Sequence, residues 1–193
     1  MAFEKTDEEI INLYKGGNRE VFKELIDKYT PSLYNFTVRL TDKENTPDII
    51  QDVFIKIWKN LNAFDIEKSS FKTWLFVVAK NTIVDFWRKS KNPEGKNKIL
   101  SFSDLEDKNN DYVFSENIQD ESLLPDEILQ KLQDKELLNK LIDKLPENYK
   151  IVLVLHYQEE MTFEEVGKIL GKPQNTVKSY HHRAIIKLRE MII

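Results

Sequence analysis

The sequence predicts a basic final helix in a chain that is acidic as a whole. Residues 171–189 contain five lysines and arginines and no aspartate or glutamate, whereas the formal net charge of the chain is -4. Lys178 and His182 are four residues apart, as are Ser179 and Arg183, so these side chains share the outer face of a helix. Because local charge sets contacts with a polyphosphate, this face favours nucleic-acid binding.

The same helix ends a helix-turn-helix pattern. Thr162 and Glu165 form a capping box, and Gly171 suits the left-handed residue that ends a helix. A second helix is expected from about Gln174, and Gly167 is small enough to let it approach closely. In such motifs the N-terminal half of the second helix meets base edges. The alternative, a solvated helix with a positive face, explains the charge but not the caps and the glycines.

A second segment, FKTWLFVVAKNTIVDFWRKSK at residues 71–91, interleaves aromatic rings with cations. Such interleaving suits single-stranded DNA, because rings stack on bases while cations hold the backbone. Asn81, Asp85 and Arg88 lie at i, i+4 and i+7, on one helix face from which they would read base edges. The alternative is that the rings belong to the core, and we expect that of most of them. The rings expected to supply the core are Trp74, Phe76 and Phe86.

The segment DIIQDVFIKIWK at residues 48–59 predicts a helix with two different faces. One isoleucine, Ile55, lies among polar side chains on the outer face. A single exposed isoleucine usually has no function, but an apolar anchor with a carboxylate rim suits a protein partner. The polar residues around it are Asp48, Gln51, Asp52 and Lys56. The residues expected on the buried face are Ile49, Ile50, Val53, Phe54, Ile57 and Trp58.

Helical spacing of apolar residues extends over almost the whole chain, which predicts an all-α fold. The sequence has only 5 Gly and 6 Pro, so it contains few helix breakers. Thr6 and Glu9 form a capping box, and Gly16 with Gly17 ends the first helix. Pro31 is expected to interrupt the next helix, and residues 60–70 to form a loop.

An acidic stretch divides the helical pattern in two. Residues 101–125 contain seven carboxylates and one lysine, without periodicity. We interpret this stretch as part of a flexible linker between two small helical domains. Helical spacing resumes at 128–145, and Pro146 opens a further helix.

Composition excludes several kinds of site. The chain has no cysteine and three histidines, so we expect no disulfide, no metal centre and no cofactor. No apolar run approaches the roughly 18 residues of a membrane span, and the first residues lack the apolar core of a signal peptide. A cytoplasmic protein without membrane insertion is expected. No arrangement of residues indicates an enzyme.

The order of four sequence blocks is more specific than any one block. The blocks are FKELIDKYTPSLYNF, PDIIQDVFIKIWKNL, FKTWLFVVAKNTIVDFWRKSK and LPENYKIVLVLHYQEEMTFEEVGKILGKPQNTVKSYHHRAIIKLRE. In this order they resemble a bacterial sigma factor of the sigma-70 family, of the extracytoplasmic function (ECF) type. The resemblance implies sigma domain 2 at 1–95, a linker at 96–126 and sigma domain 4 at 127–193. It also implies a subunit that binds core RNA polymerase and directs promoter-specific initiation.

The resemblance assigns roles to individual residues. Those implied for the clamp of the polymerase beta-prime subunit are Asp48, Gln51, Asp52, Ile55 and Lys56. Those implied for the melted −10 element are Lys72, Trp74, Lys80, Asn81, Asp85, Arg88 and Lys89. The loop that would capture a flipped-out base contributes Phe64, Asp65, Lys68 and Ser69. Those implied for the −35 element, beside the beta flap, are Asn175, Thr176, Lys178, Ser179, Tyr180, His182 and Arg183.

Three positions depart from the family pattern. Tyr180 stands where arginine is common, His181 lies near the inner face where an apolar residue is expected, and Lys80 replaces a frequent arginine. We therefore expect a weak or altered −35 readout, with an auxiliary partner supplying part of the targeting. On this hypothesis Tyr180→Arg strengthens −35-dependent transcription.

The resemblance also implies regulation by a sequestering anti-sigma factor. An alternative function is a stand-alone helix-turn-helix regulator that binds DNA without polymerase. That alternative leaves the outer face of 48–59 and the aromatic block at 71–91 unexplained.

Overall fold

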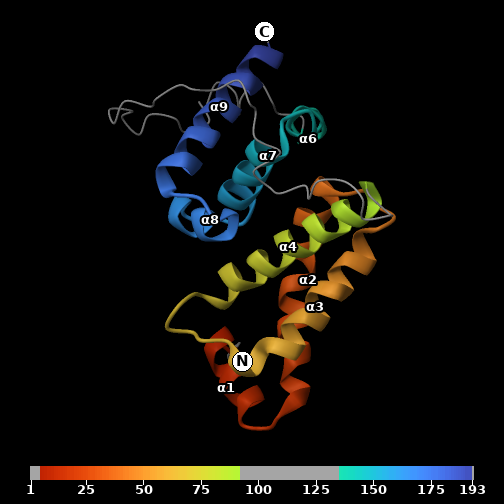
Figure 1. Cartoon of the computed structure of the whole chain (residues 1–193), viewed down its shortest axis with the longest axis vertical. Coiled ribbons are helices and arrows are strands. Elements are labelled where there is room, and N and C mark those ends of the chain that lie inside the picture. Colours follow the sequence, from red (N-terminus) through yellow and green to blue (C-terminus); the bar gives the residue numbers. More distant parts are fainter. Residues whose placement is uncertain (1–4, 92–134, 193) are drawn as a thin grey trace. The chain divides into compact units, whose positions relative to one another are not determined.

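The computed structural model describes residues 5–91 and 135–192, and every regular element in these ranges is a helix (Figure 1). The chain divides into two compact units, one built mainly from residues 1–99 and the other mainly from 100–167 and 171–193. The predicted all-α fold of two small helical units is confirmed. The whole of the linker predicted at 96–126, and the start of the helix predicted at 128, lie outside the described residues.

Three long helices form the body of the N-terminal unit. α3 packs against both α2 and α4, and α1 packs against α2 (Figure 1). Their core includes the Phe36 ring, whose centroid lies 5.1 Å from that of Phe76 in an edge-to-face pair. The elements are α1 (Asp7–Lys15), η1 (Arg19–Val21), α2 (Phe22–Leu40), α3 (Thr46–Asn60), η2 (Leu61–Ala63) and α4 (Phe71–Lys91).

α1 begins and ends as its sequence predicts. The Glu9 N–H donates to Thr6 Oγ1 over 3.3 Å, and the Thr6 N–H donates to Glu9 Oε2 over 2.8 Å, which completes the capping box. The C-cap is Gly16, and Gly17 follows with a φ of 105°, a conformation that favours glycine.

α2 contradicts the expectation that Pro31 interrupts it, because the helix runs without a break from Phe22 to Leu40. Pro31 lies on the exposed side, where it lacks an N–H to donate. Tyr29 and Leu33 on either side of it are buried, at 6% and 0% exposure. Burial of this continuous apolar face offsets the hydrogen bond that the proline removes.

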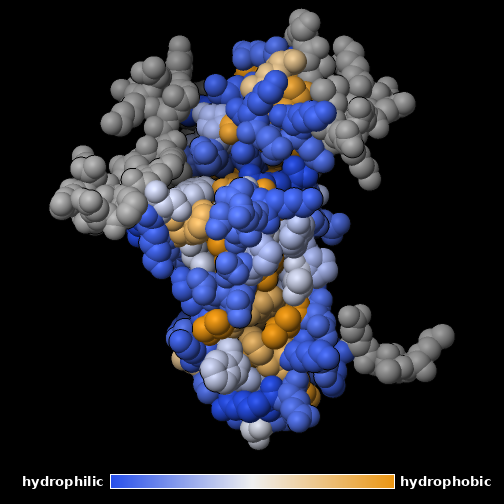
Figure 2. All heavy atoms as spheres, turned by 90° about the vertical axis from the view of Figure 1, so that its right-hand side faces the viewer, coloured by the Kyte–Doolittle hydropathy of each residue, from blue (hydrophilic) through white to orange (hydrophobic). Residues whose placement is uncertain are grey.

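Trp58 is a second correction, because its side chain was expected in the core and is 51% exposed. The chain turns from α3 into η2 just after it, and Leu61 takes the next inward position with 0% exposure. Figure 2 shows a patch of apolar atoms at the surface of the N-terminal unit, in the lower half of the view. The large apolar side chains exposed in this unit include Leu13, Ile55 and Trp58.

The C-terminal unit packs α7 against α9, with α6 also contacting α9. Gly171 has φ 67° and ψ 35°, the predicted left-handed C-cap. The capping box at Thr162 is also present, with the Glu165 N–H donating to Thr162 Oγ1 over 3.2 Å. The elements are α6 (Lys135–Asp143), α7 (Glu147–Leu153), the π-helical turn η4 (Val154–Gln158), α8 (Phe163–Leu170) and α9 (Gln174–Ile192).

Gly167 permits the close turn between α8 and α9. A Cβ atom at this position would lie 2.8 Å from the Lys172 carbonyl oxygen and 3.8 Å from Val177 Cγ2. Contacts of 2.8 Å are too short for a carbon atom, and the partner is backbone that cannot rotate away. The predicted need for a small residue is confirmed, and the atom that imposes it belongs to the turn.

We predict that Gly167→Ala lowers the free energy of unfolding of the C-terminal unit by about 1–3 kcal/mol, because the turn must shift. Urea denaturation followed by circular dichroism measures the change. Lys168→Ala is the matched control, since it adds alanine on the exposed side of the same helix. Equal stability of the Gly167 variant and the wild type would show that the turn accommodates a Cβ atom at this position.

Candidate nucleic-acid interface

The loop after α3 and the first half of α4 enclose a hollow of about 520 Å³, here called the loop hollow. All four residues predicted to capture a base line it, together with two residues predicted to read the −10 element. The structure thus brings together side chains from a loop and from a separate helix. These six lining residues are Phe64, Asp65, Lys68, Ser69, Trp74 and Asn81.

An aromatic stack lies at the loop hollow. The rings of Phe64 and Trp74 are nearly parallel, with centroids 4.7 Å apart and an interplanar angle of 24°. Phe71 meets the Phe64 ring edge-on, at 6.0 Å and 90°, and keeps it in place. Phe64 is buried, whereas Trp74, which was expected to supply the core, is only half-buried, so part of the indole remains available. A supported ring beside polar groups is what stacking on an unpaired base requires.

Asp65 shapes the loop that carries this stack. Its Oδ1 accepts from the Glu67 N–H over 3.1 Å, and its Oδ2 lies 3.1 Å from Lys68 Nζ. The Lys68 ammonium, followed by the Glu67 N–H, lowers the pKa of the Asp65 carboxyl, and the charge of Lys15 acts in the same direction. Asp65 is therefore a carboxylate at neutral pH. Its contacts with the Glu67 N–H and with Lys68 favour one conformation of the loop.

A groove of about 600 Å³ lies between α3 and α4. It unites two sets of residues that the sequence assigned to different partners. Gln51 is exposed on α3 but does not line the groove. The lining includes Asp48, Asp52, Ile55 and Lys56 of the polymerase-binding set and Asp85, Arg88 and Lys89 of the −10 set.

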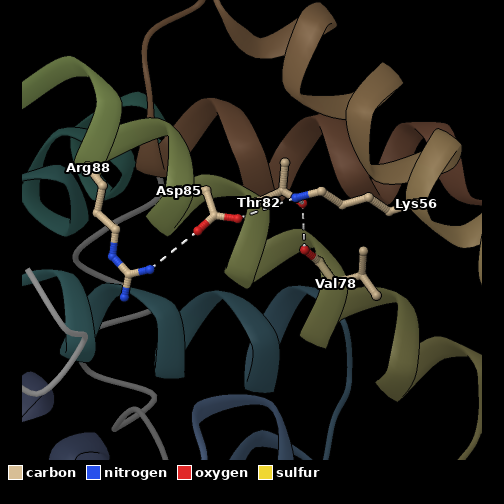
Figure 3. A network of polar contacts seen from close by, with 5 residues as sticks. All are labelled: Lys56, Val78, Thr82, Asp85 and Arg88. Atoms are coloured by element: carbon tan, nitrogen blue, oxygen red, sulfur yellow. Dashed lines mark hydrogen bonds and ion pairs between the residues drawn. The ribbon is translucent and has the colours of Figure 1, made fainter. Parts of the chain in front are cut away.

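Polar contacts connect the two helices across this groove (Figure 3). Lys56 Nζ lies 3.0 Å from Thr82 Oγ1 and 3.4 Å from Asp85 Oδ2. Arg88 Nη1 lies 3.4 Å from the other oxygen of Asp85, and the Thr82 hydroxyl donates to the Val78 carbonyl over 2.8 Å. The charged side chains are about half exposed, so the ion pairs add little stability, but they orient Asp85 and Arg88.

Lys56 lines the groove with Asp48, Asp52 and Ile55, as its predicted face requires, and it also contacts α4. It was assigned to the polymerase-binding face, and its amine points to α4 while its side chain lines both the groove and the loop hollow. Lys72 and Lys80 are half-buried on α4 and line neither of these hollows. Burial lowers the pKa of Lys80 below its ordinary value of 10.5.

Sequence reasoning assigned no role to several residues of these hollows, among them Thr82, Val78 and Asn60. Thr82 accepts from Lys56, and Val78 and Asn60 line the loop hollow. Val78 follows Trp74 by four positions and precedes Asn81 by three, so helical periodicity alone would have placed it on the same face. Asn60 had no such signal, because it lies at the end of α3.

The outer face of α9 presents most of the residues predicted for the −35 element. Lys178 is exposed, and the Ser179 hydroxyl donates to the Asn175 carbonyl over 2.9 Å. Asn175 is exposed as well. The half-buried members of the set are Thr176, Ser179, His182 and Arg183.

Tyr180 is a correction, because it does not lie on this face. Its side chain is 8% exposed, and its ring centroid lies 5.7 Å from that of Tyr149 on α7. His181, predicted near the inner face, is 2% exposed, and its Nε2 lies 2.9 Å from the Tyr157 hydroxyl. Two of the three residues that depart from the family pattern thus pack inside the C-terminal unit. An arginine at 180 would lie inside too, so the expected gain of a phosphate contact is withdrawn.

The parts of the chain that the structure describes contain neither a candidate metal site nor a candidate membrane-spanning helix. In residues 5–91 and 135–192, no group of three or more histidine or acidic side chains is placed to hold a metal ion. In the same ranges, no helix combines the length and the apolar character needed to cross a membrane.

Comparison with known proteins decides the family. Residues 25–92 match the family model of sigma-70 region 2, and residues 135–188 match that of sigma-70 region 4. The chain is 31% identical to the ECF RNA polymerase sigma factor SigW of Bacillus subtilis (strain 168) over 185 residues, 94% of each chain. The chain belongs to the ECF subfamily of the sigma-70 family. It is therefore an initiation factor that binds RNA polymerase and makes transcription promoter-specific.

Other relatives agree with this assignment. The ECF RNA polymerase sigma-E factor of Haemophilus influenzae is 27% identical over 192 residues, covering 100% of this chain and 96% of its own. Two solved structures share the fold. CnrH in complex with the cytosolic domain of CnrY has a TM-score of 0.65 at 20% identity and 96% coverage of both chains. The sigma factor RpoE of Bartonella quintana, in complex with the anti-sigma factor NepR, has a TM-score of 0.62 at 23% identity, covering 89% of this chain and 96% of that one.

We predict that Tyr180→Arg lowers the free energy of unfolding of the C-terminal unit by about 3 kcal/mol, because it places a charge inside the core. Tyr180→Phe is the control, and its cost is expected below about 1.5 kcal/mol, since it keeps the ring and loses at most one hydrogen bond. Chemical denaturation of the full chain measures both. A stable Tyr180→Arg variant with tighter −35 binding would restore the sequence-based hypothesis.

The lowered pKa of Lys80 predicts that the free energy of unfolding depends on pH. The unfolded chain binds this proton more tightly than the folded chain does, so stability should rise with pH in the alkaline window just below 10.5. Lys80→Met should remove this rise without lowering the thermal midpoint at pH 7, while binding of single-stranded DNA weakens. Melting curves from pH 7 to about pH 10 test the first part, with the exposed Lys59→Met as control. A rise that persists in Lys80→Met belongs to another group.

Proposed function

We propose that residues 1–95 act as sigma domain 2, which opens and reads the −10 element, and that residues 127–193 act as sigma domain 4, which reads the −35 element. Residues 96–126 would connect the two. One observation supports the first assignment above all. The loop hollow joins the base-capture loop to Trp74 and Asn81 of α4, so a single cavity offers stacking and hydrogen bonding together.

This geometry supports base capture. Extrusion of a base from the duplex costs a few kcal/mol, and the pocket that receives it must return that free energy. Stacking on an aromatic ring is worth about 1–3 kcal/mol per base, and Trp74 on its Phe64 support supplies such a surface. Asn81 is exposed at the rim with an amide that both donates and accepts, while exposed Lys68 lies near enough to neutralise a phosphate.

Polymerase docking uses the outer face of α3. Ile55 is 40% exposed, and the carboxylates of Asp48 and Asp52 flank it at the groove. An apolar side chain in an acidic rim suits a complementary basic surface, which we assign to the clamp of the beta-prime subunit. Gln51 adds an exposed amide to the same face.

Duplex reading uses the N-terminal half of α9. Asn175 and Lys178 are exposed there, and Thr176, His182 and Arg183 are half-exposed beside them. This half of the second helix of a helix-turn-helix enters the major groove, with phosphate contacts around it. The beta flap would contact the same unit. Because Tyr180 is buried, the face has one polar side chain fewer than the sequence suggested, which supports an auxiliary targeting partner.

The factor acts without an enzymatic reaction of its own and without a cofactor, in the cytoplasm where the polymerase transcribes. Regulation by an anti-sigma factor is part of the proposal. The similar RpoE structure contains the anti-sigma factor NepR, which supports such a partner for this chain by analogy alone. A stand-alone regulator is not favoured, because it gives no role to the α3 face or to the loop hollow.

Two variants separate docking from opening. Asp52→Arg should weaken binding to core polymerase at least about tenfold, because it reverses a charge on the docking face. Asn81→Ala should leave polymerase binding intact and reduce promoter opening by about three- to tenfold, since it removes hydrogen bonds to a captured base. Glu8→Arg, the same charge reversal at an exposed position of α1, is the control.

Gel filtration with core polymerase and permanganate reactivity of promoter DNA are the two readouts. Loss of polymerase binding in Asn81→Ala, or normal binding in Asp52→Arg, would contradict the division of roles between α3 and α4.

A further inference from the structure

α1 and η1 contact the loop that carries the base-capture residues. These two elements, residues 7–21, precede the part of the chain that matches sigma-70 region 2, which begins at residue 25. α1 nevertheless packs against η2, and its polar contacts reach the segment from the end of α3 to Phe64. Sequence analysis assigned no individual role to the residues of these two elements.

Lys15, the last residue of α1, makes the most direct of these contacts. Its Nζ donates to the carbonyl oxygen of Phe64 over 2.6 Å, across a sequence separation of 49 residues. The bond is charge-assisted and part-buried, which makes it stronger than an ordinary surface contact. Lys15 also acts on the neighbouring carboxylate, since its charge contributes to the lowered pKa of Asp65.

A second set of contacts supports the residues that precede Phe64. Arg19 Nη1 donates to Asn62 Oδ1 over 3.2 Å, and the guanidinium carbon of Arg19 lies 4.2 Å from the centre of the Tyr14 ring. The Tyr14 hydroxyl in turn donates to the Trp58 carbonyl over 3.3 Å. α1 and η1 thus contact the chain at residues 58, 62 and 64, and α4 contacts it through the Phe64 ring.

Phe64 links this support to the binding surface. Its carbonyl accepts from Lys15, and its ring stacks on Trp74 at the edge of the loop hollow. A shift of the Phe64 backbone therefore moves the ring that supports Trp74. Lys15 does not line the loop hollow, so it acts on a bound base only through Phe64.

We propose that Lys15 is a positioning residue for promoter opening: it fixes the Phe64–Trp74 stack and so sets how tightly and how selectively the loop hollow holds an unstacked base. The inference rests on the proposed function of the loop hollow. It adds a requirement that the N-terminal helix, outside the matched region, takes part in recognition.

The test compares Lys15→Met, which keeps the aliphatic stem and removes the donor, with Lys15→Arg, which keeps a charged donor. Each full-length variant is assembled with core polymerase and bound to promoter fork DNA that carries 2-aminopurine at one −10 position at a time. Fluorescence reports extrusion of the base, and a second DNA series carries an abasic site at the responsive position. Lys5→Met, which removes an exposed ion pair with Glu24, is the matched control.

We expect Lys15→Met to weaken binding of the intact fork by about three- to tenfold and to reduce the fluorescence change at the responsive position. On the abasic fork the wild type and Lys15→Met should bind equally, because no base is present for the stack to hold. Lys15→Arg should recover most of the loss. Affinity for core polymerase and the thermal midpoint should not change, and Arg19→Gln should give a smaller effect in the same direction.

Two results would overturn the inference. Equal weakening on the intact and abasic forks would mean that Lys15 acts as a general cation or stabilises the fold, and no weakening at all would mean that the contact is dispensable. In both cases a normal response of the wild type leaves the loop hollow as the base-capture site. If no position responds in the wild type, the proposed function itself fails and this inference fails with it.

Discussion

The packing of α3 against α4 is the constraint on which both proposed activities depend. The two helices share an apolar core, so the residues that remain outside are displayed along a common edge. On that edge lie four of the five docking residues of α3 and three of the reading residues of α4, connected by the Lys56 contacts to Thr82 and Asp85. A change in the packing of this pair would move both surfaces together, which couples polymerase binding to promoter reading.

The base-capture site combines stability and exposure in one cluster of rings. Phe64 and Phe71 are buried at 7% and 2% exposure, whereas Trp74 remains half-exposed next to polar side chains. Burial of the two phenylalanines stabilises the loop, and the free part of the indole remains available for a base. The ion pairs of the neighbouring groove contribute little to folding because they are solvated, so their effect is on the direction of side chains.

Much of this organisation was predictable from local sequence. Helix ends at Thr6, Thr162 and Gly171 follow from caps whose chemistry is contained within a few residues. The steric need for a small residue at 167 was also correct. The resemblance to sigma factors assigned the loop residues to one set and Trp74 and Asn81 to another, and the loop hollow is lined by residues of both sets.

The errors concern burial that depends on distant parts of the chain. Pro31 does not end α2, because the helix is held by its buried face on both sides of the proline. Trp58 and Tyr180 were placed on the wrong sides of their helices, since a helical wheel does not show which neighbour covers a boundary position. Lys15 had no signal at all, because its partner is a backbone carbonyl 49 residues away.

The most direct measurement is gel filtration of the chain with sigma-free core polymerase, followed by run-off transcription from candidate promoters. We expect the chain to elute with the polymerase, and transcripts to start at defined promoters only when the chain is present. A chain that elutes alone and yet shifts duplex DNA would contradict the account, because the α3 face and the loop hollow would then have no partner.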